Sequence, residues 1–376
     1  MSASFVATYR LESASDLEKK ALAIAVGQTA GAWDELSPRE REAVRPHLGS
    51  VVSVQKDADG SGRVEIAIPA QNVGNDVGAL VTACFGKVSM DGAIRWLDLR
   101  VPPLWPSPAG PALGVERLRE RWGLAAGRPP LMAILKPCLG LSPDELAGLF
   151  ESAARGGVDI VKDDEVLAGE AQEGDAPLRR LEACRAAAER ASQETGKLCR
   201  YAIHLSGPAD ELGERAERLV EAGAECLLVN VFVYGLPWLH ALRRRVAGRA
   251  AIMAHPAFSG AITGSATHGV AAPVLLGKLP RLLGADLVLF PSPYGTVALP
   301  GPVALEIGRE HTRPIEGVPR AFPVPSAGIK PTAVPRILED FGSDAVVNAG
   351  TGIFGHPEGP TAGARAFVRA IDEALS

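Results

Sequence analysis

Short runs of apolar residues alternate with helical patterns along most of the chain. From residue 131 onward eight such runs recur, each followed by a stretch of helical periodicity. The predicted strands are 131–135, 158–161, 198–205, 226–232, 251–254, 287–290, 321–324 and 345–347. The predicted helices are 143–155, 177–194, 210–222, 237–246, 272–283, 302–309, 331–341 and 361–375. Eight strand–helix units in about 260 residues predict a (β/α)₈ barrel. A doubly wound open sheet is the alternative, and the lack of a G-x-G-x-x-G after the first strand makes it less favoured.

The first 112 residues have a different pattern. Alternating apolar and polar positions predict strands at 5–9, 49–55, 63–68 and 94–101, with helices between them at 17–26 and 78–85. This combination is typical of a small α+β domain with an antiparallel sheet. Prolines then crowd residues 102–111 and indicate a linker. We therefore expect two domains, residues 1–112 and residues 113–376.

Composition narrows the classes of function. Of the 376 residues, 47% are hydrophobic and only 5% are aromatic, so Ala, Val, Leu and Ile must form the core. The net charge of -5, without a basic tract, gives no electrostatic basis for nucleic-acid binding. No apolar stretch reaches the roughly 18 residues that a membrane span needs. The five scattered cysteines lack a C-x-x-C pair, and the N-terminus lacks a signal pattern, so we expect a cytoplasmic protein with reduced thiols.

The most informative segment is Gly156–Glu165, where an apolar run ends in Lys162, Asp163, Asp164 and Glu165. Burying a lysine among carboxylates is costly unless the charges pair or hold a cation. Since side chains alternate along a strand, Lys162 and Asp164 should share a face. The segment is either a salt-bridged strand end or a site for a hard divalent cation. Its place after the second of eight strands favours the metal site.

Other polar residues follow the remaining strands, at the end of a barrel where active sites lie. They are Lys136, His204, Asn230, His255, Ser326, Gly328, Gly350, Thr351 and Gly352. The glycine-rich segments after the seventh and eighth strands predict a phosphate site, although tight turns would also need glycine. His255 is a candidate functional residue that could instead cap the next helix. Lys87, judged alone, would be a solvated surface lysine.

Three segments carry a resemblance to a known family. Leu135–Ser142, Gly156–Glu165 and Gly355–Gly359 closely resemble signature segments of the ribulose-bisphosphate carboxylase superfamily, and they occur in the same order. The resemblance implies a ferredoxin-like α+β domain before the barrel. It also implies a homodimer or higher even oligomer in which each active site borrows the partner's N-terminal domain.

The resemblance further implies a metal centre. In that family the lysine matching Lys162 is carbamylated by CO₂ to N6-carboxylysine. With Asp164 and Glu165 it would then hold one Mg²⁺ per site, and CO₂ would act as the activator.

Several departures argue against CO₂ fixation. Phe290–Gly295 lacks the mobile lysine that the carboxylases use, and Pro256 stands where their phosphate-binding arginine is expected. Cys138 replaces the second lysine of the K-P-K motif, and Lys87 stands where an asparagine is expected. The chain therefore resembles the carboxylase-like branches of the superfamily that retained enolisation.

Within those branches the resemblance is greatest to an enolase that acts on a diketone phosphate of methionine salvage. It implies that Lys87 of the neighbouring subunit, buried near cations such as Lys136, is the base. Lys136 and His255 complete the catalytic set, and Ser326, Gly328, Gly350 and Thr351 would bind the phosphate of a small substrate. At the phosphate and substrate end of the site, Thr351, Lys330 and His204 differ from the residues usual in that enolase. The identity of the substrate is therefore left open. The alternatives are decarboxylation of a 3-oxo sugar-acid phosphate of the 3-oxo-isoapionate 4-phosphate type, isomerisation of 5-methylthioribulose 1-phosphate, or a catalytically inactive relative.

Overall fold

The computed structural model describes residues 3–12, 16–31, 33–106 and 109–376. The chain divides into two compact units, one formed by Met1–Ala109 with Phe258–Leu279 and the other by Gly110–Ala257 with Pro280–Ser376. Thus a piece of the second half of the chain belongs to the first unit. The domain boundary expected after residue 112 stays a prediction, and residues 107–108 of the proline-rich stretch lie outside the described part.

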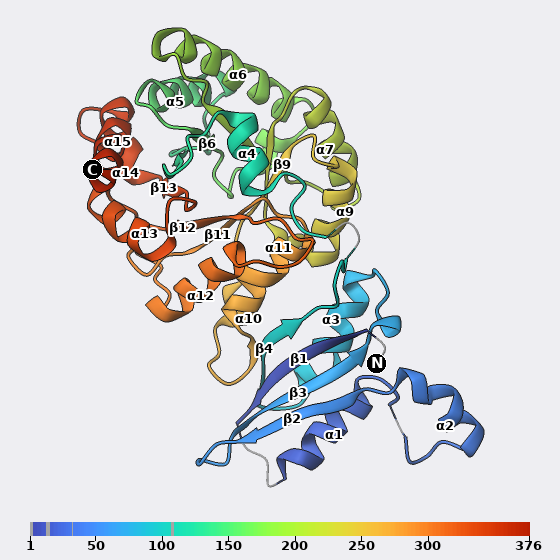
Figure 1. The fold of residues 1–376 in the computed structure, drawn as a ribbon. Helices are drawn as coiled ribbons and strands as arrows, with labels where there is room; N and C mark the ends of the chain where they lie inside the picture. Colours follow the sequence, from blue (N-terminus) through green and yellow to red (C-terminus); the bar gives the residue numbers. More distant parts are fainter. Residues whose placement is uncertain (1–2, 13–15, 32, 107–108) are drawn as a thin grey trace. The chain divides into compact units, whose positions relative to one another are not determined.

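The first unit contains a five-stranded sheet in the order β10-β4-β1-β3-β2. β1, β2, β3 and β4 pair antiparallel, whereas β10 runs parallel to β4. Helix α1 packs beside β2 and β3 (Figure 1). Its strands are β1 (Ser4–Leu11), β2 (Ser50–Lys56), β3 (Gly62–Pro69), β4 (Ile94–Arg100) and β10 (Gly269–Val270). Its helices are α1 (Leu17–Gly27), α2 (Pro38–Val44), η1 (Arg45–His47), η2 (Ala70–Asn72), α3 (Val77–Phe85), η3 (Lys87–Met90), α10 (Gly260–Thr263) and η5 (Pro273–Lys278).

The second unit is an eight-stranded parallel barrel in the order β12-β11-β9-β8-β7-β6-β5-β13. The two ends of this order meet, because the Val346 N–H donates to the Pro323 carbonyl at 2.9 Å. The interior is filled by apolar side chains, among them Met132, Ile160 and Leu228. The strands are β5 (Leu131–Ile134), β6 (Ile160–Lys162), β7 (Arg200–His204), β8 (Cys226–Val229), β9 (Ala251–Ala254), β11 (Leu287–Pro291), β12 (Phe322–Ser326) and β13 (Val347–Ala349). The predicted fold class is confirmed, and the open sheet is excluded.

Helices surround the barrel strands (Figure 1). Local sequence sets several of their ends: Ser142 and Glu145 form a capping box before α5, and Pro143 occupies its first position. The helices are α4 (Gly114–Trp122), α5 (Pro143–Arg155), η4 (Gly169–Gln172), α6 (Ala176–Thr195), α7 (Leu212–Glu221), α8 (Val231–Tyr234), α9 (Leu236–Val246), α11 (Leu279–Leu283), α12 (Gly301–Thr312), η6 (Pro331–Ala333), α13 (Val334–Phe341), α14 (Thr351–Phe354) and α15 (Pro360–Leu375).

Two predicted segments differ from the structure. The strand expected at 226–232 ends at Val229, and α8 follows, because the N–H groups of Val233 and Gly235 bond back to Asn230 and Val231. The glycine-rich loop expected after the eighth strand becomes the short helix α14 at Thr351. Among the described residues, no helix has both the length and the apolar character needed to cross a membrane.

Candidate active site

A cavity of about 390 Å³ lies at the carboxyl ends of the barrel strands. It brings together seven of the predicted site residues from five different strand ends. They are Lys136, Glu165, His255, Ser326, Gly328, Gly350 and Thr351. Carboxyl ends of parallel barrel strands are where catalytic groups of this fold converge. Of the other predicted barrel residues, Lys162 and Asp164 are tied to this cavity through Glu165 and Lys136.

Lys162 is the last residue of β6, and its side chain is fully buried. Its Nζ donates to the Asp163 carbonyl at 2.8 Å and lies 3.8 Å from Oε2 of Glu165. Burial lowers the pKa of Lys162 below its usual value, although nearby carboxylates, Glu165 foremost, act in the opposite direction. A buried lysine with a lowered pKa has more of the uncharged, nucleophilic amine than a surface lysine.

Asp164 and Glu165, the two proposed acidic ligands, differ in their partners. Asp164 is almost fully buried and forms an ion pair with Lys136. Burial alone would raise the pKa of Glu165, but the charge of Lys162 and hydrogen bonds with Asp164 bring it below the usual value. The lowered pKa favours the ionised form of Glu165, in a site that also holds two lysines.

His255 follows β9 and is directed at the same acid. Its Nε2 lies 3.3 Å from Oε2 of Glu165, while its Nδ1 accepts a hydrogen bond from the Ala257 N–H at 3.2 Å. Burial, followed by the charge of Lys162, holds the pKa of His255 well below its usual value. Hydrogen bonding therefore assigns a neutral ring with its proton on Nε2, facing Glu165.

Asn230 and His204 form the wall behind Glu165. The Asn230 Nδ2 donates to the Glu165 carbonyl at 3.1 Å and lies 3.4 Å from Nε2 of His204. The Asn230 Oδ1 is buried, and no described residue donates to it. A buried acceptor without a donor is unusual in a folded protein and marks a place where a ligand or water belongs.

The loops after β11 and β12 approach each other closely at the cavity. Ala327 and Gly328 both adopt positive φ, at 75° and 73°. A Cβ at Gly295 would lie 1.4 Å from the Ala327 carbonyl oxygen, so only glycine fits there. Positive φ at a non-glycine residue is uncommon, and such strain concentrates at functional sites.

Asn348 is a cavity residue that the sequence reasoning did not single out. It lies within β13, and its Nδ2 donates to the Ser326 Oγ at 2.8 Å. Ser326 in turn donates to the Val324 carbonyl at 2.9 Å, so its hydroxyl is already engaged. The Asn348 Oδ1 is buried without a described partner. The sequence did offer one indication, because Asn348 is a polar residue between the apolar residues Val347 and Ala349 of a barrel strand.

Lys87 belongs to the first unit and is not part of the barrel cluster. It opens η3, and its side chain is exposed in the single chain. Its burial in a site shared with a partner subunit stays a prediction. Gln28 holds the preceding turn: its Nε2 donates to the Ala83 carbonyl at 2.9 Å, and its Oε1 accepts the Val88 N–H at 3.2 Å. The backbone that carries Lys87 is therefore fixed while its side chain is free to reach outward.

The donor set can be compared with the needs of a metal ion. Within the part of the chain that the structure describes, no group of three or more His, Cys, Asp or Glu side chains could hold one. Asp164 and Glu165 supply two carboxylates beside Lys162. Because hard cations such as Mg²⁺ bind oxygen ligands, a carbamate on Lys162 would add the third anionic oxygen donor. The residues fit such a cation once Lys162 is modified.

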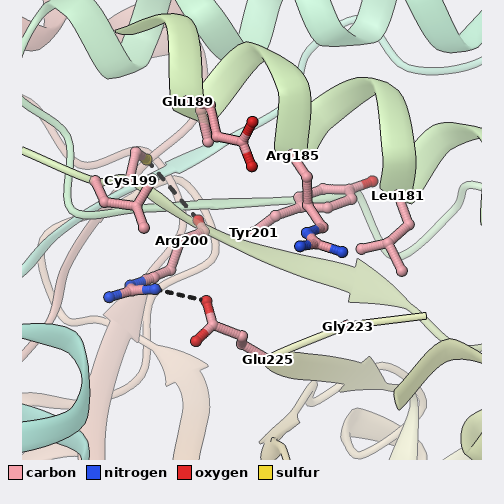
Figure 2. Close-up of a pocket in the computed structure, with 10 residues that line it drawn as sticks. Leu181, Arg185, Glu189, Cys199, Arg200, Tyr201, Gly223 and Glu225 are labelled. Atoms are coloured by element: carbon pink, nitrogen blue, oxygen red, sulfur yellow. Dashed lines mark hydrogen bonds and ion pairs between the residues drawn. The ribbon is translucent and has the colours of Figure 1, made fainter. Parts of the chain in front are cut away.

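A second hollow, of about 230 Å³, lies at the amino ends of β7 and β8, beside α6 (Figure 2). Its wall includes an ion pair between Arg200 and Glu225 at 2.8 Å. None of the predicted site residues lines it. The amino end of a (β/α)₈ barrel generally serves stability, so we place the active site in the first cavity.

Comparison with known proteins gives the family. The model of the ribulose bisphosphate carboxylase large chain, catalytic domain, matches residues 114–297 and 305–376. The chain therefore belongs to the ribulose bisphosphate carboxylase large-chain family, as the sequence motifs predicted.

Particular relatives are similar over nearly the whole chain. A 2,3-diketo-5-methylthiopentyl-1-phosphate enolase of Geobacillus kaustophilus is 45% identical, covering 99% of this chain and 92% of the relative. The crystal structure of a rubisco-like protein (MtnW) from Alicyclobacillus acidocaldarius has a TM-score of 0.90 and 43% identity, covering 98% of this chain and 93% of that one. A dimeric archaeal Rubisco from Hyperthermus butylicus has a TM-score of 0.88 and 27% identity, covering 99% of this chain and 91% of that one.

Proposed function

We propose that this chain is a Mg²⁺-dependent enolase that acts on 2,3-diketo-5-methylthiopentyl 1-phosphate and does not fix CO₂. Support comes from the 45% identity to an enolase of that name over nearly the entire length. The observation that carries the proposal is one cavity in which Glu165 and His255 face the glycine-containing loops at Gly328 and Gly350. Such a cavity suits a small substrate with an oxygen-rich end and a phosphate end.

Activation starts at Lys162. Its uncharged amine bonds to the carbon of CO₂, one C=O electron pair moves onto oxygen, and the amine loses a proton to solvent. A buried neutral amine thereby becomes an anionic carbamate beside Glu165. Carbamylated Lys162, Asp164 and Glu165 would hold Mg²⁺, which when bound supplies positive charge that stabilises an enolate oxygen.

Lys87 of the partner subunit removes the proton in this proposal. It takes a proton from the carbon that bears the phosphate ester, and the C–H electron pair forms the C=C bond of the enol. The neighbouring carbonyl oxygen gains the charge and then a proton. Lys136 contributes a positive charge next to Asp164, and the neutral His255 orients Glu165 through its Nε2 proton.

Phosphate recognition is assigned to the opposite end of the cavity. Ser326, Gly328, Gly350 and Thr351 line this end, and Asn348 lies behind Ser326. A Cβ added at Gly350 would lie 3.3 Å from the Lys136 side chain, so the loop backbone lies close to a cation. Backbone N–H groups together with a nearby ammonium group form a suitable environment for a phosphate dianion.

The working unit proposed is a homodimer, or a higher even oligomer, in the cytoplasm. The exposure of Lys87 in the single chain supports a partner that covers it, and a structural neighbour is a dimeric Rubisco. All five cysteines are free and buried, which agrees with a reducing compartment.

Deuterium exchange at the carbon next to the phosphate ester tests the proposal. With bicarbonate and Mg²⁺ present, we expect Lys87→Ala to slow exchange into the diketone phosphate by about 10²- to 10⁴-fold, the usual contribution of a general base. Lys87→Arg is the matched variant, because arginine keeps the charge but does not deprotonate. Exchange catalysed by Lys87→Arg should be as slow as that catalysed by Lys87→Ala. NMR of the substrate measures both rates.

Lys20→Ala is the control, since Lys20 is a nearby surface lysine paired with Asp91. Wild-type exchange in Lys87→Ala would rule out Lys87 as the base. No exchange with the diketone by the wild-type protein, combined with turnover of a 3-oxo sugar-acid phosphate or of 5-methylthioribulose 1-phosphate, would replace the enolase by a decarboxylase or an isomerase.

A further inference from the structure

Asp163 lies between Lys162 and Asp164 in sequence but points in another direction. Its side chain is fully buried, and its carboxylate accepts hydrogen bonds from Arg180, Tyr201 and the His204 N–H. Strand alternation explains this, because Lys162 and Asp164 face the barrel interior and the residue between them faces the helices. Asp163 therefore anchors the outer side of the turn that carries the proposed metal ligands.

Hydrogen bonds join Asp163, Arg180 and Tyr201 to one another. The Arg180 Nε lies 3.2 Å from Oδ2 of Asp163 and 3.1 Å from the Tyr201 hydroxyl oxygen. The Tyr201 hydroxyl donates to the other carboxylate oxygen, Oδ1, and the His204 N–H donates to Oδ2 at 2.9 Å. Both oxygens of Asp163 are thus engaged, and a buried ion pair of this kind holds one geometry when its hydrogen bonds are complete.

Two separate elements supply the network. Arg180 comes from α6 and Tyr201 from β7, and Figure 2 shows the Tyr201 ring beside α6. The ring packs edge-on against Phe150 of α5, with centroids 5.7 Å apart. The Tyr201 hydroxyl is consequently fixed by packing before it meets Asp163.

A direct link runs from Asp163 to Lys162. The Lys162 Nζ donates to the Asp163 carbonyl at 2.8 Å, and the Asp163 N–H donates to the Ala202 carbonyl at 3.0 Å. A rotation of Asp163 would therefore move the carbonyl that holds the Lys162 amine and also turn Asp164. The network acts on the amine that must meet CO₂ although none of its side chains lines the cavity.

We propose that Arg180 and Tyr201 are positioning residues that act through Asp163 to hold Lys162 and Asp164 in the orientation needed for carbamylation and Mg²⁺ binding. This inference rests on the proposed function, because it presumes the Lys162 carbamate. It assigns a role to two buried residues outside the cavity. Residues that orient metal ligands usually change metal affinity by about 10- to 100-fold when they are altered.

Tyr201→Phe is the decisive variant, since it removes one hydroxyl and keeps the ring that packs on Phe150. We expect the bicarbonate and Mg²⁺ concentrations for half-maximal activation to rise by about 10-fold or more. At saturating bicarbonate and Mg²⁺ the rate should return to within about threefold of wild type. The ¹³C NMR signal of the carbamate, formed with ¹³C-bicarbonate, should weaken at concentrations that saturate the wild-type protein. This readout does not depend on turnover.

Tyr9→Phe is the matched control. Tyr9 is also fully buried, and its hydroxyl donates to the Cys84 carbonyl in the first unit. Both Tyr9→Phe and Tyr201→Phe lose a buried hydrogen bond, so both should lower the melting temperature. Tyr9→Phe should leave the activation constants and the carbamate signal unchanged. Arg180→Lys, which keeps the charge but loses the planar guanidinium, should act in the same direction as Tyr201→Phe.

The outcomes distinguish a failure of the proposed carbamate from a failure of the positioning role. A wild-type protein without a carbamate signal and without bicarbonate dependence would overturn both the carbamate and this inference. A wild-type signal with unchanged activation constants in Tyr201→Phe and Arg180→Lys would overturn the positioning role alone, even if both variants melted earlier. If one variant fails to fold, the other decides.

Discussion

The Nζ of Lys162 lies 3.8 Å from Oε2 of Glu165, and the lysine side chain is completely buried. This pair places a buried amine next to a carboxylate that lines the cavity. An amine reacts with CO₂ only when uncharged, and burial lowers the pKa of Lys162 despite the neighbouring acids. The same residue pair thus explains why a lysine can occupy this position before any metal is bound.

Replacement of Lys162 by methionine should abolish bicarbonate-dependent and Mg²⁺-dependent turnover. Methionine has a similar length, so packing is largely kept while the carbamate donor is lost. Steady-state assays with and without bicarbonate measure the effect. Lys278→Met is the control, because Lys278 is another buried lysine, paired with Asp98 in the first unit. Bicarbonate-dependent activity that survives in Lys162→Met would contradict the metal-site assignment.

Mixing two inactive variants should restore activity if active sites are shared between subunits. A Lys87→Ala subunit retains the barrel site, and a Lys162→Met subunit retains the base. Random reassortment after mild denaturation and refolding should recover about a quarter of wild-type activity, since half the dimers are mixed and each has one complete site. Size-exclusion chromatography verifies the assembly.

Two further mixtures complete the complementation experiment. Lys136→Ala combined with Lys162→Met should stay inactive, because every barrel in the mixture carries one of the two changes and none is complete. Lys87→Ala combined with Lys136→Ala should recover activity. A mixture of Lys87→Ala and Lys162→Met that remains inactive while forming mixed dimers would mean that Lys87 serves the barrel of its own chain or serves neither.

Acid should destabilise the protein partly through His204. Burial is the main cause of its lowered pKa, while Asp163 opposes and Lys162 adds to the shift. Since the unfolded histidine binds a proton more readily than the folded one, the free energy of unfolding falls as the pH drops below about 6.5. The loss is at most about 1.4 kcal/mol per pH unit for one histidine. His204→Asn should therefore make the loss of unfolding free energy between pH 6.5 and pH 5.5 smaller, by no more than this limit.

Urea unfolding at pH 7.5, 6.5 and 5.5 measures this difference. Asparagine can still donate to the Leu167 carbonyl that now lies 3.1 Å from the His204 Nδ1. His47→Asn, at an exposed histidine of the first unit, serves as the comparison. An equally steep pH dependence in His204→Asn would show that other groups dominate acid unfolding.

Much of the architecture follows from local sequence. Helix α5 was predicted with its observed bounds, because Ser142, Pro143 and Glu145 define its start and Gly156 follows its end. The strand at 226–232 was too long because Val231 and Phe232 continue an apolar run, and periodicity cannot separate a buried strand from one turn of buried helix.

The site was predictable in part for a similar reason. Strand ends revealed Lys162, His255 and Ser326, because parallel strands deliver their last residues to one place. Asn348 was not predicted, because it lies inside a strand and not at its end. Its position in the cavity depends on which face of β13 is directed inward. The exposure of Lys87 depends on tertiary packing that sequence patterns do not describe.

The pairing of β10 with β4 joins Gly269 to Arg95 and Val270 to Trp96. During synthesis, the edge strand of the N-terminal sheet is therefore made only after five of the eight barrel strands. A nascent chain that ends before Gly269 leaves β4 as an uncovered edge, and long-range pairings of this kind form slowly. Since Phe258–Leu279 of the first unit interrupts the sequence of the second, no single cut in the gene separates the two units.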